Sequence, residues 1–294
     1  MPGRTGLSFR SGYFGDPAAS RALADLLQDV FGIDVTIMDR LGGPDPTGIP
    51  FSWFDADGAC IANISAFSLP LVIDGVSLHA AGLQSGAVRP GHRGMGLYRD
   101  VMEAALAHCD AEGLAAVALL TDTPALYGRY GFEPLAQHRF AGAAPMGGTA
   151  GPVRRLDLGS AADIALLRRL LDGRQPVSDR FAPVRQTGMF LFNAALMPDV
   201  RLDLIGDDAV VAWRMAGDGA FELLDVAGTR IPHLADILAS VQAAAAQVVV
   251  HFPPDRLEWQ GEALADTGEM VLMLRMAKTL RPGGPFALSP MAEF

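Results

Sequence analysis

The stretch VRPGHRGMGLYR, residues 88–99, decides the fold of this chain, because it joins a strand-like segment to a helix through a glycine-rich turn. Residues 77–88 are apolar and strand-like, and residues 97–107 carry apolar side chains at helical spacing. The helix N-terminus at this turn has unpaired backbone N–H groups and the positive end of the helix dipole, so it favours an anion. Gly94 and Gly96 let the backbone approach that anion without a Cβ clash. The pattern predicts a pyrophosphate site.

Three common glycine-rich motifs do not fit this stretch. Its order, G-x-x-G-x-G, is the reverse of the dinucleotide fingerprint, no acidic residue on a second strand follows at the expected distance, and no Walker lysine follows the glycines. The upstream run GLQSG, residues 82–86, is not a nucleophile elbow because its serine stands one place too late. The remaining match is the acyl-CoA loop R-x-x-G-x-G/A over residues 93–98, in which Tyr98 replaces the last glycine.

A second motif, TDTPALYGRYGFEP at residues 121–134, follows the buried-strand run of residues 114–120. Threonine or aspartate capping with Pro124 in the first turn predicts a short helix, and Gly131 predicts its end. This motif resembles the Y-x-x-x-G-F signature that closes the acetyl-CoA half of GNAT acetyltransferases. Together with P-x-H-R-x-x-G-L-x-R, it is similar to the Eis-like branch of multi-domain N-acetyltransferases.

The resemblance implies an α+β fold with a mixed sheet and tandem GNAT-like domains. We expect a catalytic acetyl-CoA-binding domain over residues 1–145 and a second domain over residues 146–294, joined by a Gly/Pro-rich linker at residues 141–152. The second half repeats a strand–helix–strand order but has no R-x-x-G-x-G turn, so we interpret it as a degenerate GNAT-like domain that cannot hold CoA. An unrelated α+β partner domain is the alternative. The sterol-carrier-like domain of the Eis-like branch has no counterpart in these 294 residues.

Hydrophobic periodicity and turn residues predict the elements of both halves. In the first half, antiparallel strands with turns at Asp57-Gly58 and Asp74-Gly75 give way to strand–helix–strand, which is the GNAT layout. The Gly/Pro-rich residues 42–48 predict a mobile loop. The expected helices are residues 17–30, 97–107, 161–171 and 232–246, and the expected strands are residues 7–13, 51–54, 59–69, 71–88, 114–120, 201–205, 209–215, 221–227, 248–252 and 269–275.

The same resemblance implies direct transfer of an acetyl group from acetyl-CoA to a primary amine in a ternary complex. Backbone N–H groups at the end of the first-half strand would bond the acetyl or pantetheine oxygens, and Gly86 would supply a bulge that separates this strand from its neighbour. The expected cofactor-binding residues are Ala87, Val88, Arg93, Gly94, Met95, Gly96, Leu97, Arg99 and Arg129.

Tyr127 matches the family tyrosine that protonates the CoA sulfur, because a phenol with a pKa near 10 can donate to a thiolate. The base is open. The strand of residues 78–88 has no carboxylate, so His79, a water chain and the terminal carboxylate of Phe294 are the candidates. The missing carboxylate leaves a non-catalytic acyl-CoA-binding sensor as the alternative function, although a sensor has no need of Tyr127.

Composition suits a cytoplasmic enzyme without a transmembrane segment or signal peptide. The net charge of −10 argues against nucleic acid as a partner and favours a cationic amine, either a small molecule or a peptidyl amine. Cys60 and Cys109 form no C-x-x-C, so we expect no disulfide framework and no metal. A homo-oligomer stays open.

Overall fold

The computed structural model describes residues 4–294, which divide into two units. Unit 1 holds residues 4–68, 79–120 and 294, and unit 2 holds residues 69–78 and 121–293. These units do not coincide with the expected domains, because residues 69–78 and residues 121–145 belong to unit 2. Hydrogen bonds between strands far apart in the sequence, rather than order along the chain, set this division.

The strands of unit 1 follow the order β1-β2-β3-β6-β7. Their pairings are antiparallel from β1 to β6, and the β6–β7 pairing is parallel. Helix α3 (Leu97–Ala111) makes the connection from β6 to β7, as the strand–helix–strand pattern predicts. The strands are β1 (Ser8–Ser11), β2 (Ile49–Phe54), β3 (Cys60–Ser68), β6 (Ala80–Val88) and β7 (Ala116–Thr121).

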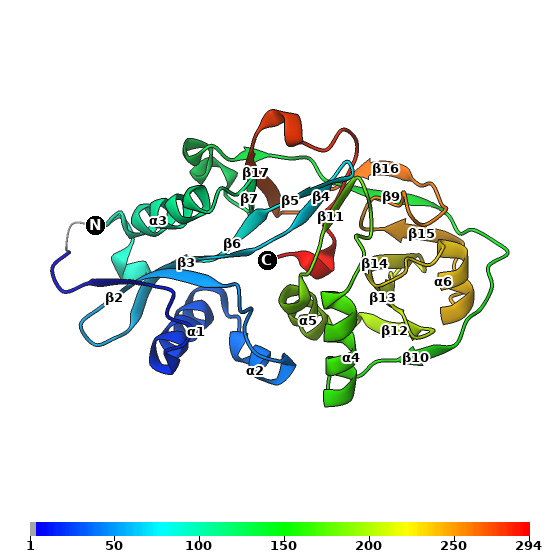
Figure 1. Cartoon of the computed structure of the whole chain (residues 1–294), viewed down its shortest axis with the longest axis horizontal. Helices are drawn as coiled ribbons and strands as arrows, with labels where there is room; N and C mark the ends of the chain where they lie inside the picture. Colours follow the sequence, from blue (N-terminus) through cyan, green and yellow to red (C-terminus); the bar gives the residue numbers. More distant parts are fainter. Residues whose placement is uncertain (1–3) are drawn as a thin grey trace. The chain divides into compact units, whose positions relative to one another are not determined.

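Helix α1 (Pro17–Phe31) shows why the periodic pattern near the N-terminus folds as it does. Asp16 accepts hydrogen bonds from the first-turn N–H groups, and Gly32, with φ 69°, ends the helix. Its apolar face is buried, as predicted. Helices α1 and α3 cover opposite faces of the sheet (Figure 1), which is why β3 is buried along nearly its whole length.

The segment between α1 and β2 contains the 3-10 turn η1 (Val35–Ile37) and the short helix α2 (Met38–Leu41). Residues 42–48 then form the expected irregular loop. Its Thr47 hydroxyl accepts a hydrogen bond from the Ser68 N–H at 3.0 Å, which ties the loop to the end of β3.

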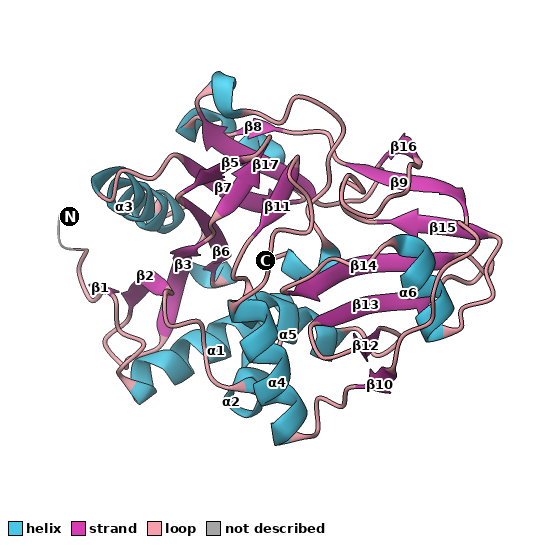
Figure 2. Ribbon diagram, turned by 45° about the vertical axis from the view of Figure 1, so that its right-hand side comes forward, coloured by secondary structure: helices cyan, strands magenta, loops and turns pink. Residues whose placement is uncertain are grey.

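Unit 2 repeats the pairing pattern of unit 1, in which antiparallel strand pairs are followed by one parallel pair. Its main sheet follows the order β10-β12-β13-β14-β15-β9-β16 (Figure 2). The β13–β14 pairing is antiparallel and the β14–β15 pairing is parallel. Helix α6 (Leu234–Val241) connects β14 to β15 along the chain. The strands are β9 (His138–Ala143), β10 (Val153–Arg155), β12 (Arg201–Ile205), β13 (Ala209–Met215), β14 (Phe221–Gly228), β15 (Gln247–Val250) and β16 (Glu262–Ala265).

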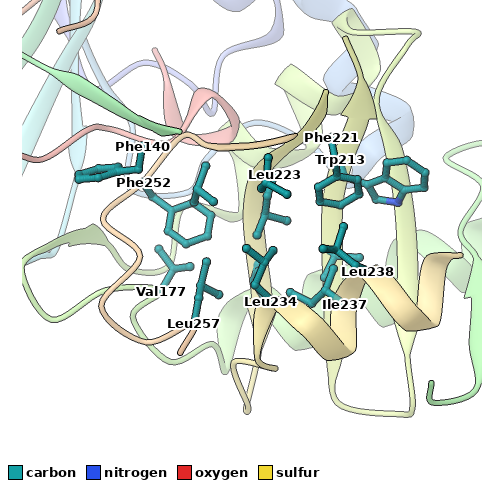
Figure 3. Packing of buried hydrophobic residues seen from close by; sticks show 14 of the residues in the cluster. Phe140, Val177, Trp213, Phe221, Leu223, Leu234, Ile237, Leu238, Phe252 and Leu257 are labelled. Carbon is teal, nitrogen blue, oxygen red and sulfur yellow. The ribbon is translucent and has the colours of Figure 1, made fainter. Parts of the chain in front are cut away.

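The core of unit 2 lies between this sheet and α6 (Figure 3). Trp213 stacks on Phe221 with ring centroids 5.0 Å apart, and Leu234 and Ile237 of α6 are fully buried in the same cluster. Each such side chain contributes about 1.5–3 kcal/mol through burial. Packing therefore holds α6 on the sheet.

Smaller elements complete unit 2. A three-stranded sheet has the order β11-β4-β5, and β17 pairs with β8 antiparallel. Two further helices, α4 and α5, lie in the chain between β10 and β12 of the main sheet. The bounds are β4 (Leu71–Ile73), β5 (Val76–Leu78), β8 (Glu133–Pro134), α4 (Ala161–Asp172), β11 (Phe181–Pro183), α5 (Thr187–Leu196), β17 (Val271–Met276), η5 (Lys278–Leu280) and η6 (Pro290–Ala292).

The stretch expected to be a linker is bound to the body of unit 2. Residues 141–143 belong to β9, the Thr149 N–H donates to Asp236 at 2.8 Å, and the Gly151 N–H donates to the Ser240 hydroxyl at 3.0 Å. Both acceptors lie on α6, so the small residues permit close contact rather than flexibility. None of the helices in residues 4–294 has the length and apolar character needed to cross a membrane.

Candidate active site

The glycine-rich turn between β6 and α3 adopts the backbone that the sequence predicts. Gly94 and Gly96 have φ values of 80° and 78°, in the left-handed region that favours glycine. Gly96 is the N-cap of α3, and among the described residues no side chain caps this helix. The first-turn N–H groups and the positive end of the dipole therefore favour an anion at this end of α3.

Arg4 holds this turn in place, and sequence reasoning missed it. Its Nε and Nη2 atoms donate to Asp100 Oδ2 at 3.0 and 2.7 Å, and its Nη1 atom donates to the Met95 carbonyl. Because Arg4 neutralises Asp100 in the first turn of α3, the helix N-terminus keeps its attraction for an anion. Arg4 lies 96 residues from Asp100 in the sequence, so no local pattern could reveal this contact.

Arg93 and Arg99, the cations predicted beside the turn, have different contacts from the neighbouring Arg89. Arg93 and Arg99 are exposed, and Arg99 lies 4.0 Å from each of Asp100 and Glu103. Arg89 instead donates to the Cys60 carbonyl at 2.8 Å and pairs with Asp29. Arg93 and Arg99 thus present exposed guanidinium groups beside the turn, with the Arg93 Nε 3.4 Å from the Val88 carbonyl, whereas Arg89 holds the end of β6.

Strand β6 carries a bulge and then separates from β7. The parallel pairing ends at Leu83 and Leu119. On the other edge, the register with β3 shifts so that Ser85 and Gly86 together oppose one residue, which defines the bulge. The bulge was predicted from Gly86, but the residue with left-handed backbone is Ser85, with φ 59°.

The bulge needs glycine at position 86 for a reason of space. A Cβ atom there would lie 2.6 Å from the Tyr98 hydroxyl of α3. Tyr98, the departure from the loop pattern, therefore packs directly on the bulge.

The Arg89 N–H donates to the Ile61 carbonyl of β3 at 2.9 Å. By the alternation of antiparallel strands, the Ala87 N–H also faces β3, so of the two predicted amides only that of Val88 faces the opened edge.

The structure does not bring His79 together with this turn. His79 is exposed immediately before β6, and its carbonyl accepts from the Ala115 N–H at 2.8 Å. At about 3.3 Å per residue, the strand separates it from Val88 by roughly 30 Å. Phe294 also belongs to unit 1, and its ring meets Phe67 of β3 edge-on at 5.0 Å.

Tyr127 lies in unit 2 between the 3-10 turns η3 (Pro124–Leu126) and η4 (Gly128–Tyr130), which replace the expected short helix. Its half-buried ring meets Phe132 edge-on at 6.2 Å. Gly131, with φ 86°, ends the second turn as predicted. Arg129 donates to the Tyr130 hydroxyl at 2.8 Å and stacks over its ring, so the Tyr130 hydroxyl has a partner of its own.

In the part of the chain that the structure describes, no group of three or more His, Cys, Asp or Glu side chains is arranged to hold a metal ion. Cys60 and Cys109 are both buried and free of disulfide bonds. Burial raises the pKa of the Cys60 thiol to about 11, which keeps it protonated.

Comparison with known proteins assigns the region of the turn to one family. Residues 22–135 match the model described as the acetyltransferase (GNAT) domain. An uncharacterized N-acetyltransferase of Streptomyces griseus is 35% identical over 101 residues, which are 34% of this chain and 24% of that protein. The uncharacterized N-acetyltransferase YhbS of Escherichia coli K12 is 40% identical over 84 residues, 29% of this chain and 48% of YhbS. The chain thus spans less than half the length of each relative.

Solved structures extend the likeness of fold. A probable N-acyltransferase of Enterococcus faecalis V583 has a TM-score of 0.62 at 17% identity and covers 92% of this chain and 72% of its own. Eis1 from Mycobacterium abscessus has a TM-score of 0.59 at 14% identity and covers 92% and 73%. The mixed α/β fold expected from the motifs is confirmed. The family match around the turn and the likeness of fold lead to one conclusion: the chain contains a GNAT acetyltransferase domain.

Proposed function

We propose that this protein is an N-acetyltransferase that moves an acetyl group from acetyl-CoA to a primary amine by direct attack in a ternary complex. The observation that carries the proposal is the end of β6. There the strand loses β7 as a partner, exposes backbone N–H groups and leads into the uncapped N-terminus of α3. A pantetheine arm has free strand amides to bond, and a pyrophosphate has a helix N-terminus.

Different residues bind the donor carbonyl, hold the pyrophosphate and donate the proton in this reaction. The Val88 N–H binds a carbonyl oxygen of the donor, and Gly94, Met95, Gly96 and Leu97 hold the pyrophosphate through their amides. Arg93 and Arg99 add charge. As the amine nitrogen bonds to the carbonyl carbon, the C–S bond breaks and Tyr127 donates its phenolic proton to the departing thiolate. The amine proton passes to a water chain.

Release of free thiol from acetyl-CoA in the presence of different amines tests this function. We expect turnover with cationic primary amines, including polyamines, aminoglycosides and peptides with lysine, and none without an acceptor. Turnover confined to neutral or anionic amines would contradict the proposed acceptor class.

A non-catalytic acyl-CoA sensor is the second candidate, and one observation favours it. Strand β6, with the sequence AAGLQSGAV, has no carboxylate that could serve as a base. The same assay separates the two candidates, because a sensor binds acetyl-CoA and turns over no amine. Calorimetric titration with acetyl-CoA, run beside the thiol assay, gives the binding result that this distinction needs.

A further inference from the structure

We propose that Asn63 is a positioning residue: through the carbonyl of Ser85 it orients the Ser85–Gly86 peptide so that the Gly86 N–H bonds the acyl carbonyl of the donor. This inference rests on the proposed acyl-CoA site. Asn63 lies on β3, next to the bulge of β6, and its side chain is fully buried. This role needs no contact between Asn63 and the substrate.

A network of buried polar side chains in unit 1 connects Tyr13 to the bulge. The Tyr13 hydroxyl lies 2.6 Å from the Ser52 hydroxyl, which lies 2.7 Å from Asn63 Oδ1. Asn63 Nδ2 lies 2.9 Å from the Ser85 carbonyl oxygen and 3.2 Å from the Ser65 hydroxyl. All four side chains are buried, so the network is costly to break.

Only one direction of hydrogen-bond donation satisfies this network of polar groups. The Ser85 carbonyl can only accept, so the Asn63 amide must present its NH₂ group there and its oxygen to Ser52. The Ser52 hydroxyl then donates to Asn63 and accepts from Tyr13. Burial raises the pKa of Tyr13 above its ordinary value, so the phenol keeps the proton that it donates. The network therefore ends in a donor aimed at the bulge.

That donor fixes the direction of the bulge peptide. Ser85 has a left-handed backbone that residues other than glycine seldom adopt, so outside contacts must hold it. In a trans peptide the N–H points opposite to the C=O. Because the Ser85 carbonyl points to a side chain of β3, the Gly86 N–H points away from β3, to the edge where pairing with β7 has ended.

Tyr98 supports the same peptide from α3. Its hydroxyl and ring occupy the space where a Cβ of residue 86 would lie, so Gly86 packs against the helix without a side chain of its own. Asn63 and Tyr98 together hold one N–H group before substrate arrives. A donor that is already oriented stabilises the negative charge on the carbonyl oxygen without reorganisation during the reaction.

Kinetics of Asn63→Ala provide the first test, with Ser65→Ala as the matched control. Ser65 is buried in the same network and contacts the same Asn63 nitrogen, but it does not hold the bulge. We expect Asn63→Ala to lower kcat by roughly 10²-fold with little change in the KM for acetyl-CoA, because a misplaced donor affects the chemical step. Ser65→Ala should keep kcat within about twofold of the wild type.

An NMR experiment follows the Gly86 N–H itself and does not depend on turnover. The chain has only two Ser-Gly pairs, Ser11-Gly12 and Ser85-Gly86, so ¹³C-carbonyl serine with ¹⁵N-glycine labelling leaves two amide signals. We expect acetyl-CoA and CoA to shift the Gly86 signal differently, because CoA lacks the acyl carbonyl. Gly12 serves as the internal control. In Asn63→Ala the difference should vanish, and in Ser65→Ala it should remain.

Each result has a defined meaning. Identical Gly86 signals with acetyl-CoA and CoA in the wild type would overturn the proposed contact. Equal losses in Asn63→Ala and Ser65→Ala would reduce the network to a structural role and overturn the positioning. If the Gly86 difference holds but no amine is acetylated, the positioning stands and the proposed transfer reaction is wrong. If Asn63→Ala does not fold, the Gly86 signals of the wild type and of Ser65→Ala with acetyl-CoA and with CoA still decide whether the Gly86 N–H contacts the acyl carbonyl.

Discussion

At the scale of single residues, Tyr127 carries the proton step of the proposed reaction. Tyr127→Phe should leave the affinity for acetyl-CoA nearly unchanged and lower turnover by about 10²-fold, the usual contribution of one general acid. Tyr130→Phe is the matched control, because Tyr130 lies in the same motif and its hydroxyl is bound by Arg129. Calorimetry and the thiol assay measure the two quantities. Equal losses of turnover in both variants would remove Tyr127 from the mechanism.

Glu293 predicts a pH dependence of stability. Burial, with a smaller contribution from the charge of Asp266, raises the pKa of Glu293 to about 7. The folded state therefore binds this proton more tightly than the unfolded state, so its stabilising effect is complete below about pH 4.5 and is lost as the pH rises through 7. At about 1.4 kcal/mol per pKa unit, the loss is on the order of 3 kcal/mol.

Urea unfolding between pH 4.5 and 8 checks this expectation. Glu293→Gln, which is neutral at every pH, should be less dependent on pH than the wild type and more stable at pH 8. Asp266→Asn should remove only a small part of the dependence, because burial is the larger cause. The same slope in the wild type and in Glu293→Gln would show that Glu293 titrates normally.

At the scale of elements, the turn between β6 and α3 depends on two glycines with left-handed backbone. Gly94→Ala and Gly96→Ala should each weaken acetyl-CoA binding by about tenfold, because a side chain costs about 1–2 kcal/mol in that conformation. Gly91→Ala is the control. Gly91 lies in the same turn without a positive φ, and no described residue lies within 4 Å of its Cβ position. Equal weakening in all three variants would mean that backbone conformation is not the cause.

At the scale of the whole molecule, the two units have related strand orders but different turns before the crossover helix. In unit 2 the carbonyl of Leu224 on β14 accepts from the Ser289 hydroxyl at 2.9 Å, and Arg174 pairs with Asp225 at 2.5 Å in full burial. Residues of β14 beyond its pairing with β15 therefore have contacts of their own in unit 2. CoA should therefore protect residues 86–99 from hydrogen exchange and leave residues 226–240 unchanged. Protection of the second segment would contradict this assignment of the site to unit 1.

The net charge of −10 adds a second expectation at this scale. Attraction of a cationic amine by an acidic protein weakens as salt shortens the Debye length, which is about 10 Å at 0.1 M. The kcat/KM of the amine should fall with added salt, and more steeply for a polyamine than for a monoamine. Thiol assays at several salt concentrations measure this slope. A slope that does not change with the charge of the amine would show that the overall charge does not steer the acceptor.

Local patterns in the sequence were sufficient for most elements and for the glycine turn. Helix α1 follows from apolar spacing, Asp16 and Pro17, and the left-handed glycines at 94 and 96 follow from the motif, because each depends on residues within one or two turns. Helix α5 escaped prediction because its sequence, TGMFLFNAAL, is apolar on most sides and shows no clear periodicity.

Contacts between distant residues determined the rest. Arg4 reaches Asp100, Asn63 reaches Ser85, and β4 pairs with β11, and in each case the partners are brought together by sheet register and packing. Register also turned the Ala87 amide to β3, moved the bulge backbone to Ser85 and left His79 at the far end of its strand. A motif records which residues are neighbours along the chain. Hydrogen bonds across the sheet depend on which strands pair and in what register, and these follow only from the folded arrangement of the whole chain.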